Sequence, residues 1–154
     1  MQSKPKLYLE SSVVCMYFQD SASYLRDLTR QFWEDELNNY FIHISEIVLG
    51  EIRATKNLRL RDLFENLVRD FEVLKATDDV FRLSNVYSSH RRMPRGDFLH
   101  IAMASISGVD FLVTWNLRHL HKVGTQELIK EINIDLKIPI PEIVTPADLL
   151  EEDI

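Results

Sequence analysis

Short apolar runs alternate with amphipathic segments along nearly the whole chain, and this alternation constrains the fold more than any other feature. Apolar residues recur at three- and four-residue steps in the longer segments, which predicts helices between the short runs. Such alternation predicts an α/β fold with a central, mainly parallel sheet of about four or five strands, flanked by helices. The expected strands are residues 7–9, 41–44, 73–74, 111–114 and 142–144. The expected helices are 22–38, 46–55, 59–71, one from 78 or 79 to about 88, one that Asp97 opens and Gly108 closes, 125–135 and one from 146.

The stretch 95–120, RGDFLHIAMASISGVDFLVTWNLRHL, contains a helix, a turn and a strand. Asp97 and His100 are three positions apart, so they are expected on one helical face. Gly108 is expected to close the helix, because glycine readily adopts the left-handed conformation found at helix ends. The strand that follows leads to Asn116, and ligands usually bind at the carboxyl ends of strands in open α/β sheets. An acid at a helix start and an amide past a strand end are therefore expected to face one site.

Length and composition fit an ordinary globular protein with a single domain, residues 1–154. Hydrophobic residues make up 45% of the chain and charged residues 27%. No apolar run approaches the roughly 20 residues that a membrane helix needs, so we expect no membrane segment. The only cysteine, Cys15, cannot form an intrachain disulfide, and the start of the chain lacks the apolar core of a signal peptide. These features favour a cytoplasmic location.

The net charge of −6 argues mildly against a protein that holds nucleic acid by overall charge alone. A phosphate-containing partner would have to contact a local cationic patch or metal ions held by clustered acids. The chain has one cationic cluster, His90, Arg91, Arg92 and Arg95, which leads directly into Asp97. Phosphate contact by Arg91, Arg92 and Arg95 and a merely solvated loop are both compatible with this pattern.

Several polar residues occupy places where a sheet could bring them together. Glu10 follows the first expected strand, Asp97 opens a helix and Asn116 follows a later strand, while Glu51 lies on a separate helix. Clustered carboxylates repel one another and usually persist because a cation neutralises them. Oxygen ligands of this kind suit Mg²⁺ or Mn²⁺ better than zinc. Spacing alone favours a plainer interpretation, in which these acids are helix caps and solvated charges.

Four segments of the chain, YLESSVV, ISEIVLGEI, GDFLHIAMASISGVDFLVTWNLRHL and IPEIVTPADLL, resemble the PIN-domain family, in the family's order. They are most similar to the branch of VapC-type toxins from type II toxin–antitoxin systems. The resemblance extends from about residue 6 to residue 150, and the central segment is its most specific part. It implies a three-layer α/β/α fold and a metal-dependent endoribonuclease that prefers single-stranded RNA. It also implies a cognate antitoxin that blocks the site, and a homodimer.

The resemblance implies a catalytic set of Glu10, Glu51, Asp97 and Asn116, with the three acids as ligands of Mg²⁺ or Mn²⁺. Two of these positions depart from the family's pattern. Glu10 stands where aspartate is usual, and Asn116 keeps an oxygen ligand but removes a charge. Three carboxylates support one bound ion better than two.

Neighbouring residues have two possible roles each. Ser12 and Thr114 either orient the metal ligands or hydrogen-bond the backbone. His100 either faces the site or is a buried, hydrogen-bonded core residue, and the second role is the commoner one. Asp110 precedes its strand and is expected at the opposite end of the sheet, as a turn residue. Glu46 is expected to stabilise the start of its helix.

Two other functions remain open from the sequence. The first is a binding module with the same fold and a weakened site, which acts through its antitoxin or another protein; Glu10 and Asn116 keep this alternative open. The second is a phosphoryl-transfer enzyme of another α/β fold. Such an enzyme requires an aspartyl nucleophile, and glutamate at the first-strand position argues against one.

Overall fold

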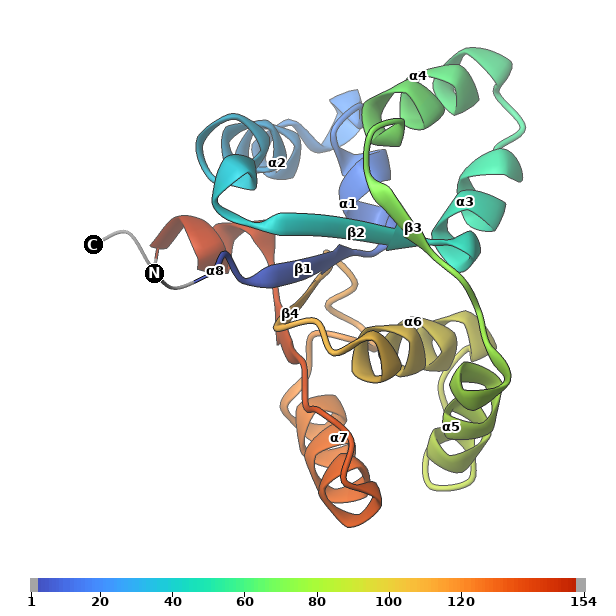
Figure 1. Ribbon diagram of the computed structural model, residues 1–154. Helices are drawn as coiled ribbons and strands as arrows, with labels where there is room; N and C mark the ends of the chain where they lie inside the picture. Colours follow the sequence, from blue (N-terminus) through green and yellow to red (C-terminus); the bar gives the residue numbers. More distant parts are fainter. Residues whose placement is uncertain (1–2, 152–154) are drawn as a thin grey trace.

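Five short strands form a fully parallel sheet through the middle of the protein (Figure 1). The computed structural model describes residues 3–151 of the chain. The spatial order of the strands is β3-β2-β1-β4-β5. This confirms the predicted α/β class and gives the sheet five strands, all parallel. The strands are β1 (Lys6–Leu9), β2 (Phe41–Ser45), β3 (Glu72–Leu74), β4 (Phe111–Val113) and β5 (Glu142–Val144).

Helices cover both faces of this sheet, as Figure 1 shows. The helices before β3 lie on one face, and those that connect β3 to β4 and β4 to β5 lie on the other. On the first face are α1 (Ser11–Met16), α2 (Ser23–Asp35), α3 (Glu46–Arg53) and α4 (Leu58–Val68). On the second are α5 (Asp78–Ser88), α6 (Arg95–Ser107) and α7 (Val123–Leu136), while α8 (Pro146–Glu151) packs against α2. Two short 3₁₀ turns, Asp20–Ala22 and Leu37–Asn39, flank α2.

The core lies between the sheet and these helices. The central strands are apolar on both faces, as expected for a parallel sheet with helices on each side. Helix α6 is buried almost all round, because it packs between the sheet and α5. No helix among residues 3–151 is long and apolar enough to cross a membrane. Fully buried residues on β1 and β4 include Leu7, Tyr8, Leu9, Leu112 and Val113.

Local sequence explains where α3 begins and where α6 ends. The Ser45 hydroxyl accepts a hydrogen bond from the Val48 N–H and caps α3, as predicted. Gly108 closes α6 with φ of 70°, the left-handed conformation predicted for it. Asp110 lies at the amino end of β4, where its carboxylate accepts a bond from the Lys6 N–H at 2.8 Å. Asp110 is therefore at the opposite end of the sheet from the residues that follow β1 and β4.

The sequence did not predict α1. Its six residues follow β1 directly, and the residue that caps it is Glu10, whose side chain accepts a bond from the Ser12 N–H. Two predicted helices are also too long at their carboxyl ends. Helix α2 stops at Asp35, before a 3₁₀ turn. Helix α4 stops at Val68, because the chain must turn back into the edge strand β3.

The chain changes direction across the sheet between β1 and β4. From β1 it proceeds outward to β2 and β3, and it then returns to β4 on the other side of β1. In α/β proteins, ligands bind outside the carboxyl ends of the strands at such a switch point. Glu10 follows β1, and the segment 114–116 follows β4, so both lie at this position.

Candidate metal centre

Glu10 lies at the switch point with its carboxylate held by hydroxyl and amide donors. Its side chain is buried, with 7% exposure. Oε2 accepts a bond from the Ser12 N–H at 3.0 Å, and Oε1 accepts bonds from the Ser12 hydroxyl and from the Thr114 hydroxyl at 2.6 Å. The two hydroxyl oxygens also accept backbone bonds, from the Trp115 and Asn116 N–H groups respectively. Ser12 and Thr114 therefore both hold a candidate metal ligand and bond the backbone, which are the two roles that the sequence left open.

Glu51 reaches the same place from α3. Its Oε1 accepts a bond from the Ser11 hydroxyl at 2.7 Å and lies 2.6 Å from Nε2 of His100. Partial burial would by itself raise the pKa of Glu51, but the bond and charge of His100, together with the Ser11 bond, lower it below its usual value. Glu51 is therefore a carboxylate at neutral pH.

Asp97 stands in the first turn of α6 and is half-buried. Its Oδ1 accepts a bond from the Asn116 amide at 3.3 Å, whereas its Oδ2 is buried and has no hydrogen-bond partner among the described residues. Burial raises the pKa of Asp97, the nearby charges of Glu10 and Glu51 raise it further, and His119 opposes the shift.

His100 completes the group of possible ligands. Glu10, Glu51 and His100 each offer one ligand atom, and these three atoms all lie within 4.8 Å of one another. His100 is 1% exposed, and its Nδ1 lies 2.7 Å from the Tyr8 hydroxyl. It is thus a buried, hydrogen-bonded histidine that also faces the acids. Its three-residue spacing from Asp97 was the sequence signal for this position.

The residues fit a small divalent cation. Glu10, Glu51 and Asp97 supply carboxylate oxygens, which suit Mg²⁺ or Mn²⁺. A buried carboxylate oxygen without a partner is costly, and a bound cation would remove that cost for Oδ2 of Asp97. Asn116 contacts Asp97 through its amide, and its own Oδ1 accepts a bond from the His119 N–H at 3.0 Å.

The three arginines of the cationic cluster have different surroundings. The guanidinium of Arg91 lies against Gly124 at the start of α7, where a Cβ atom would come within 2.9 Å of it. Arg95, two positions before Asp97, lines a cavity of about 300 Å³ with residues of α5, and Arg92 is exposed. They lie in the connection from α5 to Asp97, and contact with phosphate remains a prediction.

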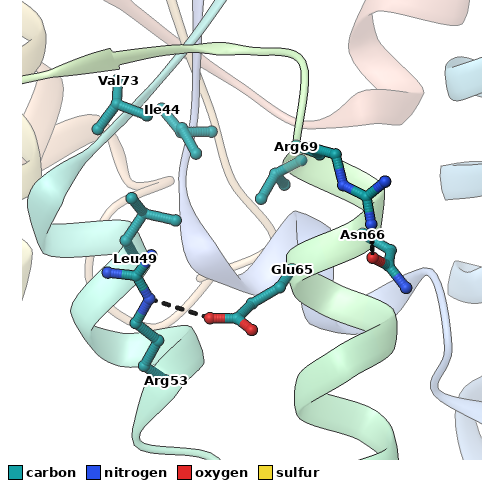
Figure 2. Close-up of a pocket in the computed structure, with 8 residues that line it drawn as sticks. Ile44, Leu49, Arg53, Glu65, Asn66, Arg69 and Val73 are labelled. Carbon is teal, nitrogen blue, oxygen red and sulfur yellow. Dashed lines mark hydrogen bonds and ion pairs between the residues drawn. The ribbon is translucent and has the colours of Figure 1, made fainter.

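A separate pocket of about 400 Å³ lies between α3, α4 and β3 (Figure 2). Leu49 and Arg53 of α3 line it, and Arg53 forms an ion pair of 2.9 Å with Glu65 of α4. Glu51 belongs to the same helix but bonds to Ser11 and His100 instead. The pocket is therefore a different site from the acid group, which we define as Glu10, Glu51 and Asp97.

Comparison with known proteins gives a match in structure. No protein-family model and no curated protein matches the sequence. The chain is similar to a chain in the crystal structure of VapBC2 from Rickettsia felis bound to a DNA fragment from their promoter. The TM-score is 0.56 at 16% sequence identity, and the match covers 90% of this chain and 98% of the other. Together with the five-stranded parallel sheet, this match shows that the chain has a PIN-like α/β fold.

Proposed function

We propose that the protein is a VapC-like toxin, a metal-dependent endoribonuclease that hydrolyses phosphodiester bonds of RNA. The observation that carries the proposal is Oδ2 of Asp97, which is buried, has no hydrogen-bond partner among residues 3–151 and feels the charges of Glu10 and Glu51. The PIN-like fold and the position of these acids at the switch point support it. The proposal treats the chain as one domain that acts in the cytoplasm.

In this proposal Glu10, Glu51 and Asp97 hold Mg²⁺ or Mn²⁺. The bound ion supplies an activated water and stabilises negative charge on the phosphate that is cut. The chain's own residues fix the ligands: Asn116 orients Asp97 through its amide. Ser12 and Thr114 hold the carboxylate of Glu10 and keep both of its oxygens at the switch point.

The RNA chain itself would be held by cations near Asp97. In the proposal Arg91, Arg92 and Arg95 contact phosphates of the RNA. Their place in the connection that leads into α6 supports this role, since Arg95 opens the same helix that carries Asp97. A local cationic segment of this kind is what a protein of net charge −6 needs to approach RNA.

The proposal also includes a cognate antitoxin as partner and a homodimer of the toxin. The similarity to a chain from a VapBC2 complex supports the antitoxin. Co-expression with the product of the neighbouring gene tests it: a stable complex that suppresses RNA cleavage is expected. Light scattering of the purified protein tests the dimer.

A catalytically weakened binding module remains the second candidate, because two observations favour it. The carboxylate of Glu10 already accepts three hydrogen bonds, and Asn116 contributes no charge to the site. Both features lower the attraction for a cation. In this case the protein would act through a protein partner and would not cut RNA.

Substitution of Asp97→Asn separates the two candidates. The amide keeps the size of the side chain but removes the charge, so we expect cleavage of single-stranded RNA in Mn²⁺ to fall at least a hundredfold. Asp78→Asn is the matched control, since Asp78 is an exposed acid in the first turn of α5. Equal cleavage by Asp97→Asn and wild type would contradict the nuclease mechanism. Absence of cleavage and of Mn²⁺ binding in wild type would favour the binding module.

A further inference from the structure

A buried chain of hydrogen bonds runs from β2 through β1 and α6 to Glu51. The Ser45 hydroxyl lies 2.7 Å from the Tyr8 hydroxyl, which lies 2.7 Å from Nδ1 of His100. Nε2 of His100 then lies 2.6 Å from Oε1 of Glu51. Ser45, Tyr8 and His100 are all 1% exposed or less. Water has no access to these three side chains, so each of their donors must be matched to an acceptor within the chain.

The direction of the last bond follows from its surroundings. Oε1 of Glu51 accepts the Ser11 hydroxyl bond at 2.7 Å and lies 2.6 Å from Nε2 of His100, and a carboxylate oxygen accepts hydrogen bonds. Nε2 of His100 must therefore carry a proton and donate it to Oε1. This holds for the neutral ring, with Nδ1 accepting from Tyr8, and equally for the charged ring. A nitrogen that donates this proton has no lone pair for a metal ion, and Nδ1 faces Tyr8.

We infer that His100 is a positioning residue for the metal site, held by Tyr8 and Ser45, and not itself a ligand. The inference rests on the proposed function. His100 and the Ser11 hydroxyl both bond to Oε1 of Glu51 and fix the plane of its carboxylate. Neither bond engages Oε2, which lies near Gly96, one residue before Asp97. The carboxylate thus presents Oε2 toward the segment that carries Asp97.

Binding of Mn²⁺, followed by electron paramagnetic resonance, tests this role without reference to activity. Removing an outer partner of a metal ligand typically weakens metal affinity about 10- to 100-fold, and we expect this loss for His100→Leu. His100→Gln restores an N–H donor and is expected to recover most of the affinity. Tyr8→Phe removes only the hydroxyl that orients the ring, so a smaller loss of several-fold is expected.

Tyr87→Phe is the matched control for Tyr8→Phe. Tyr87 is also fully buried, and its hydroxyl bonds to Asn133 at 2.6 Å and Ser105 at 3.2 Å in a network between α5, α6 and α7. Both substitutions remove a buried hydroxyl that bonds two partners, so both are expected to lower the melting temperature. Only Tyr8→Phe is expected to weaken Mn²⁺ binding, whereas equal affinities in the two variants would overturn the inference.

Two spectroscopic measurements complete the test. With ¹⁵N-labelled histidine, the bound Mn²⁺ is expected to show no nitrogen coupling, and a coupling assigned to His100 would make it a ligand and overturn the inference. In the metal-free protein, the Nε2 proton of His100 should exchange slowly with solvent. A spectrum without a signal from this proton would also overturn the inference. Wild type that binds no Mn²⁺ would contradict the proposed function, while Mn²⁺ binding unchanged in His100→Leu would contradict the positioning role alone.

Discussion

Glu10 combines two roles at the residue level, because its side chain caps α1 and also belongs to the acid group. Helix caps are usually shorter polar residues, whose oxygen bonds the N–H two or three positions later. Here Oε2 accepts the Ser12 N–H, while Oε1 accepts the hydroxyls of Ser12 and Thr114. The longer side chain of glutamate therefore ties the start of α1 to the end of β4 through one carboxylate.

Substitution of Asn116 tests its place at the metal site. Its amide donates to Asp97, while its Oδ1 accepts the His119 N–H. Aspartate would keep the second bond, lose the first and add a negative charge beside Asp97. We expect Asn116→Asp to tighten Mn²⁺ binding about tenfold, equivalent to about 1.4 kcal/mol, and to lower the melting temperature of the metal-free protein. Calorimetric titration and thermal unfolding measure the two effects.

Asn39→Asp provides the control for this substitution. The Asn39 amide also donates to a carboxylate, that of Glu36, at 3.0 Å, in the 3₁₀ turn that leads into the amino end of β2. The control repeats the change in charge and the lost bond, and Mn²⁺ affinity should stay at the wild-type level. If Asn116→Asp also leaves the affinity unchanged, Asn116 does not contact the ion.

The order and type of most elements could be predicted, because each strand and helix carries its pattern locally. The strand Phe111–Val113 is a continuous apolar run, and Gly108 marks the helix end before it. Helix α1 was missed, since it is only six residues long and its cap is a glutamate. The bond between His100 and Glu51 joins residues 49 positions apart and depends on how α3 and α6 face each other, so no local pattern specifies it.

The connection between α5 and α6 carries two of the arginines that are proposed to bind RNA. If Arg91 and Arg92 contact phosphates, replacing both with glutamine should weaken binding to single-stranded RNA. Each lost contact should reduce the slope of log affinity against log salt by about 0.7, so the pair should reduce it by about 1.4. Fluorescence anisotropy at several salt concentrations measures this slope.

The control for the two arginines removes the same charge elsewhere. Lys4 lies before β1 at the amino end of the sheet, and Lys130 is exposed on α7. Their joint replacement by glutamine should leave the salt slope nearly unchanged. A slope that falls equally in both double variants would mean that RNA responds to net charge, and a slope unchanged in Arg91 and Arg92 variants would assign these residues to another role.

At the scale of the whole molecule, the acid group joins parts of the fold that are far apart in sequence. Glu10 follows the central strand β1, Glu51 comes from a helix on one face of the sheet, and Asp97 comes from a helix on the other. Without a cation the negative charges of these carboxylates repel one another. Burial raises the pKa of Asp97, and the charges of Glu10 and Glu51 raise it further. The folded, metal-free protein therefore loses stability from Asp97 as pH rises through this raised pKa.

A bound ion should reverse this loss and stabilise the entire fold, because the unfolded chain cannot bring the three acids together. At a Mn²⁺ concentration about 100 times the dissociation constant, binding adds about 2.7 kcal/mol to the free energy of unfolding. For a domain of this size that corresponds to a rise of about 5–10 °C in melting temperature. Asp97→Asn should melt above wild type without metal, since it removes the disfavoured charge, and should gain little from Mn²⁺. Asp78→Asn should respond to Mn²⁺ as wild type does, and a full rise in Asp97→Asn would place the ion away from the acid group.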